Sequence, residues 1–316
     1  MKKMRPPRLA HLDPHTPDVG LFKVRSKHTP RLKAEEFTTK ELNESGLVIK
    51  YVTPYPLSDV DMRVFIAAMG LCTKSPHAIN SEALKDQKTL WDKFLTEGDA
   101  VHRDAATIQT TAYHLATSAG LEWSGNVSKT LSECLERLSS VQTTWRQGSK
   151  VMSGSQMLSY AFDEDSGELK ISISPLLAKA ILGSAGRHTR FSLDEMRKLT
   201  QPASRILHLI LTGRLGVGGK RKKRDFTFHV DGLAVAAYGH PTSPAMKRKR
   251  RMYVRDALDE LDSLDHWLIT FDSKKELVHV THWDDKNIQD LQINEERLDK
   301  IQRQLEGLDS PDPVED

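Results

Sequence analysis

A helix with two unlike halves places the strongest constraint on how this chain folds. Residues 244–261 can form one helix, because Pro244 suits the first helical position and the Ser243 side chain can cap it. The second half carries apolar residues at helical spacing: Val254, Ala257, Leu258, Leu261 and Leu264. The first half carries five consecutive cations: Lys247, Arg248, Lys249, Arg250 and Arg251. No side of that half can be buried without stranding charge, so it must face solvent or a partner.

The elements around this basic helix favour nucleic-acid binding. A short helix is predicted at residues 231–239, followed by a turn that contains Pro241. A short helix, a turn and a second helix form the helix-turn-helix order, in which the start of the second helix meets base edges in the major groove. A hairpin is predicted next, at residues 267–271 and 277–281. A charge run alone is equally typical of a solvated surface or a localisation signal, and the flanking elements favour DNA.

A similar order of elements is expected earlier in the chain. Thr111 to Gly120 is a predicted short helix, Gly125 closes a turn, and residues 127–141 carry the apolar stripe of a second helix. Strands are expected at residues 47–52, 141–146, 156–162, 169–173 and 226–230, and further helices at 58–71, 175–182, 193–199 and 203–215. Repetition of this order predicts an α+β fold with two tandem winged-helix domains, each a helix-turn-helix followed by a β-hairpin wing.

The predicted organisation has four parts. They are a basic N-terminal arm at residues 1–45, winged-helix domains at 46–174 and 175–283, and an acidic C-terminal helix or tail at 284–316. Residues 1–33 hold nine Lys or Arg against two Asp, a net charge of +7, and residues 284–316 hold eleven Asp or Glu against four Lys or Arg, a net charge of −7. Such polarity is typical of interaction tails on a neutral body. The spacing of apolar residues in 288–308 fits packing on its own domain, self-association or docking to another protein.

Composition excludes several classes of protein. The chain has no run approaching the ~20 apolar residues of a membrane span, and its N-terminus lacks the apolar segment of a signal peptide. Cys72 and Cys134 have no Cys or His neighbour at metal-ligand spacing. We therefore expect a cytoplasmic protein with reduced cysteines.

Two motifs resemble a nucleotide site and a metal site, but each lacks a feature that such a site requires. Gly219-Lys220 resembles the end of a phosphate loop, but Arg214 stands at the first glycine position and Arg221 replaces the Ser or Thr that holds magnesium. Histidines at 279 and 282 are three apart on a predicted strand, so they point to opposite faces and cannot share a metal.

No catalytic set is present in the sequence. Asp59 and Asp61 are typical of carboxylates at a helix start rather than of a metal doublet. There is no Gly-x-Ser-x-Gly elbow and no metal-binding histidine triplet beside a nucleophilic tyrosine. We expect a binding protein rather than an enzyme, with no cofactor and no bound metal.

The candidate DNA contacts fall in three groups. The helix start supplies base or phosphate contacts from Lys247, Arg248, Lys249, Arg250, Arg251 and Arg255, with Arg248, Lys249, Arg251 and Arg255 preferred. Phosphate contacts are expected from Lys220, Arg221, Lys222, Lys223 and Arg224 and, at the hairpin tip, from Lys274 and Lys275. The first domain offers Ser124, Asn126, Ser128 and Lys129 at its helix start, with Arg146 and Lys150 near its wing.

Five stretches of the sequence also carry a resemblance to a known family. They are residues 20–22, 56–63, 131–138, 169–176 and the basic helix from Met246 to Leu258. Together they resemble the IncQ-type plasmid replication initiators, the RepC-like proteins, over roughly residues 20–283. The acidic tail from Asp284 and the five-cation loop at 216–224 depart from that family.

The resemblance implies a tandem winged-helix protein that binds directly repeated DNA (iterons) at a plasmid origin. Such proteins open the adjacent AT-rich DNA, let a plasmid helicase and primase load, and often limit their own expression or copy number. The alternative is a winged-helix transcriptional regulator that does not melt DNA. A primase or nickase is the weaker alternative, because the metal and tyrosine sets of such enzymes are missing.

Overall fold

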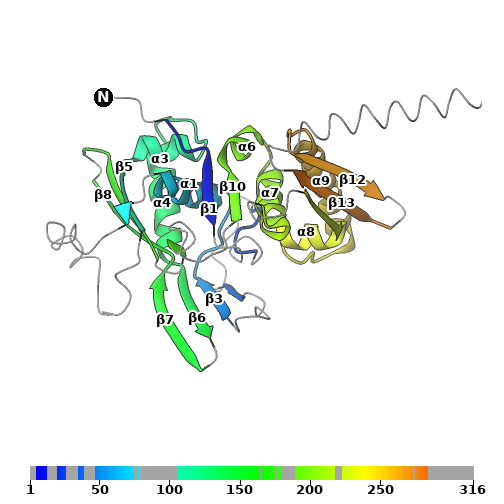
Figure 1. Ribbon diagram of the computed structural model, residues 1–316, viewed down its shortest axis with the longest axis horizontal. Helices are drawn as coiled ribbons and strands as arrows, with labels where there is room; N and C mark the ends of the chain where they lie inside the picture. The colour runs from blue at the N-terminus through cyan, green and yellow to red at the C-terminus, as the bar shows by residue number, and fades with distance from the viewer. Residues whose placement is uncertain are drawn as a thin grey trace, which may run out of the picture.

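Helices and small antiparallel sheets make up a mixed α/β molecule (Figure 1). A computed structural model describes residues 5–12, 20–25, 35–38, 47–74, 77–78, 106–147, 149–163, 165–174, 177–178, 189–217, 223–272 and 275–283. The predicted C-terminal helix at 288–308 lies outside these residues, and only Leu177 and Ala178 of the helix expected at 175–182 lie within them.

The C-terminal unit consists of three helices and a three-stranded sheet. In chain order its elements are α7 (Pro202–Leu215), β11 (Lys223–His229), α8 (Val230–Tyr238), α9 (Pro244–Asp262), β12 (Trp267–Asp272) and β13 (Leu277–Trp283). The sheet has the order β11-β13-β12 and is antiparallel throughout. These elements agree with the predicted ones to within a few residues.

The N-terminal unit has the same order of elements. They are α1 (Asp59–Lys74), β5 (Ala106–Thr111), α3 (Ala112–Ser118), α4 (Val127–Ser139), β8 (Leu158–Phe162) and β9 (Glu168–Ile173). Its strands pair in the order β5-β9-β8, with β4 (His77–Ala78) added beside β5. In both units, the strand before the two helices pairs with the last strand of the following hairpin.

An inserted hairpin distinguishes the N-terminal unit. Strands β6 (Gln142–Gln147) and β7 (Lys150–Gln156) follow α4 and join β3 (Leu47–Thr53) and β2 (Glu35–Thr38) in the sheet β2-β3-β6-β7. The hairpin extends away from the body below α4 in Figure 1. The sequence pattern does not predict β7, because this polar strand lacks the apolar alternation by which a half-buried strand is recognised.

Parts of the expected N-terminal arm belong to the folded body. Strand β1 (Leu9–Leu12) pairs antiparallel with β10 (Thr189–Ser192), and the side chains of Leu21 and Phe22 are buried. The Val24 amide donates to the Ala237 carbonyl oxygen at 2.8 Å. These described segments therefore differ from an extended arm, because their few apolar residues pack into the core.

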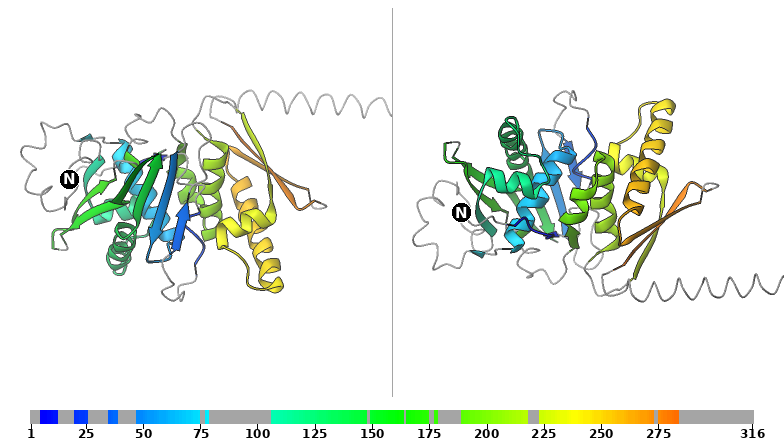
Figure 2. Two further views of the ribbon diagram at one scale, coloured as in Figure 1. Left: turned by 90° about the horizontal axis from the view of Figure 1, so that it is seen from below. Right: turned by 90° about the horizontal axis from the view of Figure 1, so that it is seen from above.

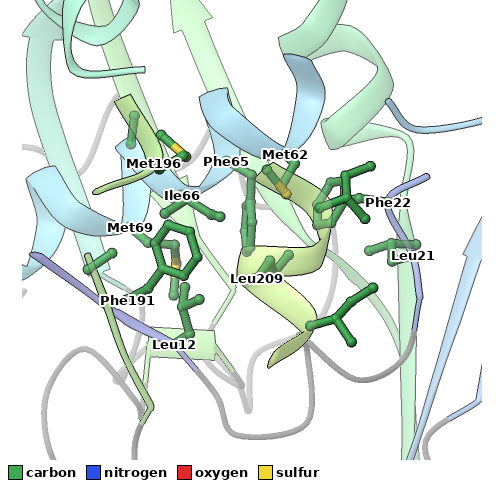
Figure 3. Close-up of a cluster of buried hydrophobic side chains, with 14 of the residues drawn as sticks. Leu12, Leu21, Phe22, Met62, Phe65, Ile66, Met69, Phe191, Met196 and Leu209 are labelled. Carbon is green, nitrogen blue, oxygen red and sulfur yellow. The ribbon is translucent and has the colours of Figure 1, made fainter. Parts of the chain in front are cut away.

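One continuous hydrophobic core joins the two units. Helix α1 is its centre, with Met62, Phe65, Ile66 and Met69 fully buried. Figure 3 shows these side chains packed with Phe191 of β10 and Leu209 of α7. A mostly buried ion pair between Arg205 of α7 and Asp59 of α1, at 3.1 Å, also links the units.

Arginine contacts reinforce the same junction. Arg197 of α6 (Leu193–Lys198) donates to the Ser118 carbonyl at 2.8 Å and to the Pro7 carbonyl at 2.9 Å. Arg63 donates to the carbonyls of Ala119 and Gly120, and desolvation by burial, with Arg205 nearby, lowers the pKa of Arg63 to about 10. Guanidinium groups from α1 and α6 thus hold the C-terminal end of α3.

Candidate nucleic-acid interface

The basic half of α9 extends beyond the C-terminal unit to which its other half is fixed. Ser243 accepts a hydrogen bond from the Met246 amide at 3.2 Å, and Pro244 occupies the first turn, as predicted. Val254, Ala257, Leu258 and Leu261 are buried. In both views of Figure 2, the yellow N-terminal end of α9 projects past its neighbours. The predicted helix with one anchored half is therefore confirmed.

The cations at the start of α9 differ in their surroundings. Lys247, Arg248 and Lys249 are exposed, whereas Arg250 and Arg251 are half-buried. Arg250 donates to the Gly239 carbonyl at 2.6 Å, and its guanidinium carbon lies 5.7 Å from the centre of the Tyr238 ring. Arg250 thus fixes the turn between α8 and α9, which sets the direction in which the basic half points.

Aromatic rings support this turn on the side of α8. Tyr238 and Tyr253 lie with their ring centroids 6.3 Å apart, and the Lys249 ammonium lies 5.6 Å from the Tyr253 ring. Burial, followed by the proximity of Tyr253, raises the pKa of Tyr238 to about 12, although Arg250 opposes the shift. Tyr238 therefore stays protonated and uncharged beside the cations across the physiological pH range.

Two carboxylates face one side of the basic half. Asp231, in the first turn of α8, accepts two hydrogen bonds from Arg251, at 2.5 and 2.7 Å, and pairs with Lys247 at 3.0 Å. Glu276, in the turn between β12 and β13, pairs with Arg251 at 3.5 Å and with Arg255 at 2.9 Å. Hydrogen bonds from Arg251 and then Lys247 hold the pKa of Asp231 well below its usual range.

The four residues of α9 that the sequence favours as DNA contacts thus lie in two environments. Arg251 and Arg255 lie against carboxylates of the protein itself. Arg248 and Lys249 are exposed, and within the described residues no carboxylate pairs with either of them. A sequence cannot separate these environments, because the partners of Arg251 are 20 and 25 residues away along the chain.

The hairpin turn lies beside the basic half of α9, since Glu276 contacts both Arg251 and Arg255. Lys275 is exposed there; its amide donates to an Asp272 carboxylate oxygen at 3.2 Å, and its ammonium lies 4.0 Å from that side chain. Lys274 lies outside the described residues, as do Lys220, Arg221 and Lys222. Lys223 and Arg224 lie in β11, at the end paired with Trp283 and His282.

The candidate DNA contacts of the N-terminal unit lie in two separate places. Ser124, Asn126, Ser128 and Lys129 gather at the start of α4, where Ser124, Asn126 and Lys129 are exposed. Arg146 and Lys150 lie near the tip of the β6–β7 hairpin, which leaves the opposite end of α4. This hairpin joins the sheet of β3, and the hairpin equivalent in strand order to β12–β13 is β8–β9.

The residues that suggested metal sites have other contacts. Ser58 donates to Asp61 from its amide at 2.8 Å and from its hydroxyl at 2.7 Å, and Arg137 pairs with Asp61 at 2.9 Å. His279 is exposed and His282 is buried, so they lie on opposite faces of β13. Among the described residues, no group of three His, Cys, Asp or Glu side chains could hold a metal ion, and no helix is long and apolar enough to cross a membrane.

Several exposed residues near these helix starts are not predicted as functional from the sequence. Met252 is 51% exposed on α9, between the two halves of the helix. Tyr113 and Trp123, also exposed, pack edge to face near the start of α4 with centroids 5.4 Å apart. The only signal available for Met252 was its position two residues from the buried stripe at Val254.

Comparisons with known proteins agree with this architecture. The family described as Replication protein C (RepC) matches residues 8–279, which is most of the chain. No curated protein sequence shows significant similarity to it. The crystal structure of domains 2 and 3 of RctB, a selenomethionine derivative, is similar with a TM-score of 0.50 at 10% identity. That match covers 83% of this chain and 95% of the RctB chain.

A second crystal structure of RctB domains 2 and 3 has a TM-score of 0.43 at 11% identity, covering 85% of this chain and 97% of that one. At these identities the likeness to RctB is one of fold. The match to RepC extends from β1 to the start of β13, so it includes nearly all of both units and the basic helix.

Proposed function

The chain belongs to the replication protein C (RepC) family, and we propose that it initiates replication by binding double-stranded origin DNA through the start of α9. The observation that carries this proposal is the exposed basic half of α9, held rigidly by a buried second half and flanked by a hairpin turn. A helix presented in this way suits the major groove, where arginine pairs with guanine.

Both units are proposed to be winged-helix domains. In the C-terminal unit, α8 and α9 would form the helix-turn-helix and β12–β13 the wing; α3, α4 and β8–β9 would be their counterparts. In both views of Figure 2, the green helix α4 and the start of α9 lie toward the same side of the molecule, which suits a single duplex near both. The start of α4 is much less cationic, so we assign sequence recognition mainly to α9.

The domain boundaries proposed from the sequence need one adjustment. Units at 46–174 and 175–283 fit the repeated order of elements, but β1 belongs to the shared body through its pairing with β10. A role for residues 1–45 as a DNA-binding arm would therefore be limited to the parts outside 5–12, 20–25 and 35–38. The acidic segment at 284–316 is proposed to be a protein-contact or self-association segment.

We infer the more specific activities from membership of this family. Members are expected to bind directly repeated sequences, open adjacent AT-rich DNA and permit a plasmid helicase and primase to load. Limiting its own synthesis or copy number would follow if the repeats overlap its promoter. We propose each of these activities for this chain, acting in the cytoplasm.

Footprinting on the DNA flanking its own gene tests the binding proposal. We expect protection of repeated sites, and a log–log salt dependence with a slope of roughly −7 if about eight phosphates are neutralised. Binding that is equal on all duplexes, or absent, would contradict the proposal.

Permanganate reactivity separates an initiator from a transcriptional regulator. An initiator should make thymines beside the bound repeats reactive in supercoiled DNA, because local melting unstacks them. A regulator of the same fold should leave them protected. Protection of repeats without new reactivity would thus favour the regulator.

A further inference from the structure

Asp231 and Glu276 divide the basic half of α9 into two sides. We infer that these carboxylates are positioning residues, which hold Arg251 and Arg255 on the protein so that Arg248, Lys249 and Met252 face the bases. The inference rests on the proposed DNA-binding function and goes beyond it by naming the side of α9 that reads sequence.

One side of α9 carries a row of cations, spaced by about one helical turn, that pair with these two carboxylates. Lys247, Arg251 and Arg255 are four residues apart, so they lie along one side of α9. Asp231 contacts the first two of these cations, and Glu276 contacts the last two. A DNA phosphate approaching this row would meet two carboxylates as well as three cations, which weakens its attraction.

Asp231 and Arg251 form a bidentate ion pair. Two of the three guanidinium nitrogens, Nε and Nη2, donate to different carboxylate oxygens at 2.5 and 2.7 Å. Bidentate pairs are shorter and more directional than single ion pairs. The Arg251 side chain is only 27% exposed, so the pair is partly shielded from water and salt.

Glu276 connects three elements at one point. Its carbonyl oxygen accepts a hydrogen bond from the Val230 amide at the start of α8, at 3.0 Å. Its carboxylate reaches Arg251 and Arg255 on α9, and its backbone lies in the hairpin turn with a φ of 54°. A left-handed backbone at a non-glycine residue costs free energy, which these contacts offset. Glu276 therefore fixes the hairpin turn relative to α9.

The remaining side of α9 faces away from the body. Met252 is two residues from buried Val254, and at about 100° per residue this places it on nearly the opposite side of the helix. Arg248 is one turn before Met252, and Lys249 is its neighbour on the same outward face. All three residues are exposed.

The outward side has the chemistry to read bases. Arginine can donate two hydrogen bonds to the O6 and N7 atoms of guanine, and apolar groups contact the methyl group of thymine. Arg248 and Met252 would supply these two modes at adjacent base pairs. Asp256 and Asp259 follow on the exposed part of the helix, so the favourable surface for DNA ends near Met252.

The test uses duplexes that the full-length protein selects from a random-sequence 30-base-pair library. Affinities for a selected duplex and for an unrelated duplex of equal length are then measured across a range of salt concentrations. The ratio of the two affinities reports discrimination, and the salt slope reports phosphate contacts. Melting temperature and circular dichroism confirm that each variant is folded.

Arg251→Gln and Arg248→Gln should have different effects on DNA binding. We expect Arg251→Gln to lower discrimination with an unchanged salt slope, because this cation touches the protein rather than the DNA. Arg248→Gln should relax selection at one base-pair position, by roughly 5–150-fold, and Met252→Ala should weaken a preference for thymine nearby. A salt slope that shrinks by about 0.9 in Arg251→Gln would place Arg251 on a phosphate and overturn the inference.

Glu276→Gln and Asp231→Asn test the carboxylates directly. Each should reduce discrimination while binding to the unrelated duplex stays equal or tightens, since a negative charge is removed. Asp265→Asn is the matched control: it removes an exposed carboxylate, 75% exposed and paired with Lys198 at the far end of α9, and should leave discrimination unchanged. Folded Glu276→Gln protein that discriminates as well as the wild type would overturn the positioning role.

Failure of the inference is distinct from failure of the proposed function. If the wild-type protein selects no sequence and binds no duplex, the DNA-binding proposal itself is wrong. If it selects a sequence but Arg248→Gln and Met252→Ala select the same one, DNA binding stands and only the assigned side of α9 is wrong.

Discussion

Glu195 is a buried carboxylate whose ionisation stabilises the C-terminal unit. It pairs with His208 at 2.8 Å and accepts a hydrogen bond from the Trp267 indole at 3.2 Å. Burial alone would raise the pKa of Glu195, but the bonds from His208 and Trp267 prevail and lower it to about 2. Because the pKa is lower in the folded state, the stabilisation is present above the unfolded pKa, near 4.5, and is lost as pH falls towards 2.

We expect Glu195→Gln to lower the free energy of unfolding by about 1–3 kcal/mol at neutral pH, since it weakens hydrogen bonds to a charged group. The variant should also lose less stability than the wild type between pH 4.5 and pH 2. Urea unfolding at several pH values measures both effects. Parallel pH curves for the two proteins would mean that Glu195 is not the group that titrates.

At the scale of the element, α9 is stable in its second half and depends on its cap in the first. Ser243→Ala removes the cap at the Met246 amide, which costs about 1 kcal/mol of helix stability. We expect this loss to appear as fraying of the basic half, with weaker DNA binding and little change in melting temperature. Hydrogen exchange of the Met246 and Lys247 amides, measured beside DNA affinity, checks this.

Ser263 provides the control for that experiment at the other end of the same helix. Its hydroxyl donates to the Glu260 carbonyl at 2.6 Å, and it caps the end that follows the buried half. Ser263→Ala should leave DNA affinity unchanged. Equal loss of affinity in both variants would show that the basic half does not depend on its own cap.

For the whole molecule, the shared core and the Asp59–Arg205 ion pair predict that the two units unfold together. The side chains of this pair are only 12% and 14% exposed, so removing one partner leaves a charge with little access to water. We expect Arg205→Met to destabilise the protein by about 3–5 kcal/mol, and the double variant Asp59→Asn, Arg205→Met to be less destabilised than the sum of the single variants.

Chemical unfolding followed by both tryptophan fluorescence and circular dichroism measures these differences. A single coincident transition is expected for the wild type. Two separated transitions would instead show that the units are independent domains and that the pair is not a structural link.

The sequence alone determined the elements whose signals are local. The cap at Ser243, the apolar stripe of α9 and the alternation in β12 and β13 each depend on residues within a few positions, so their types and bounds were predictable. The basic half of α9 could also be recognised as unburied, because five adjacent cations leave no apolar side.

Only the tertiary structure decided which of those cations remain available to a partner. Asp231 and Glu276 reach Arg251 from 20 and 25 residues away, and their positions depend on how α8 and the hairpin pack. The pairing of β1 with β10 likewise joins residues far apart in the chain, such as Leu12 and Thr189. No local pattern encodes such contacts, because they form only when separate elements share one core.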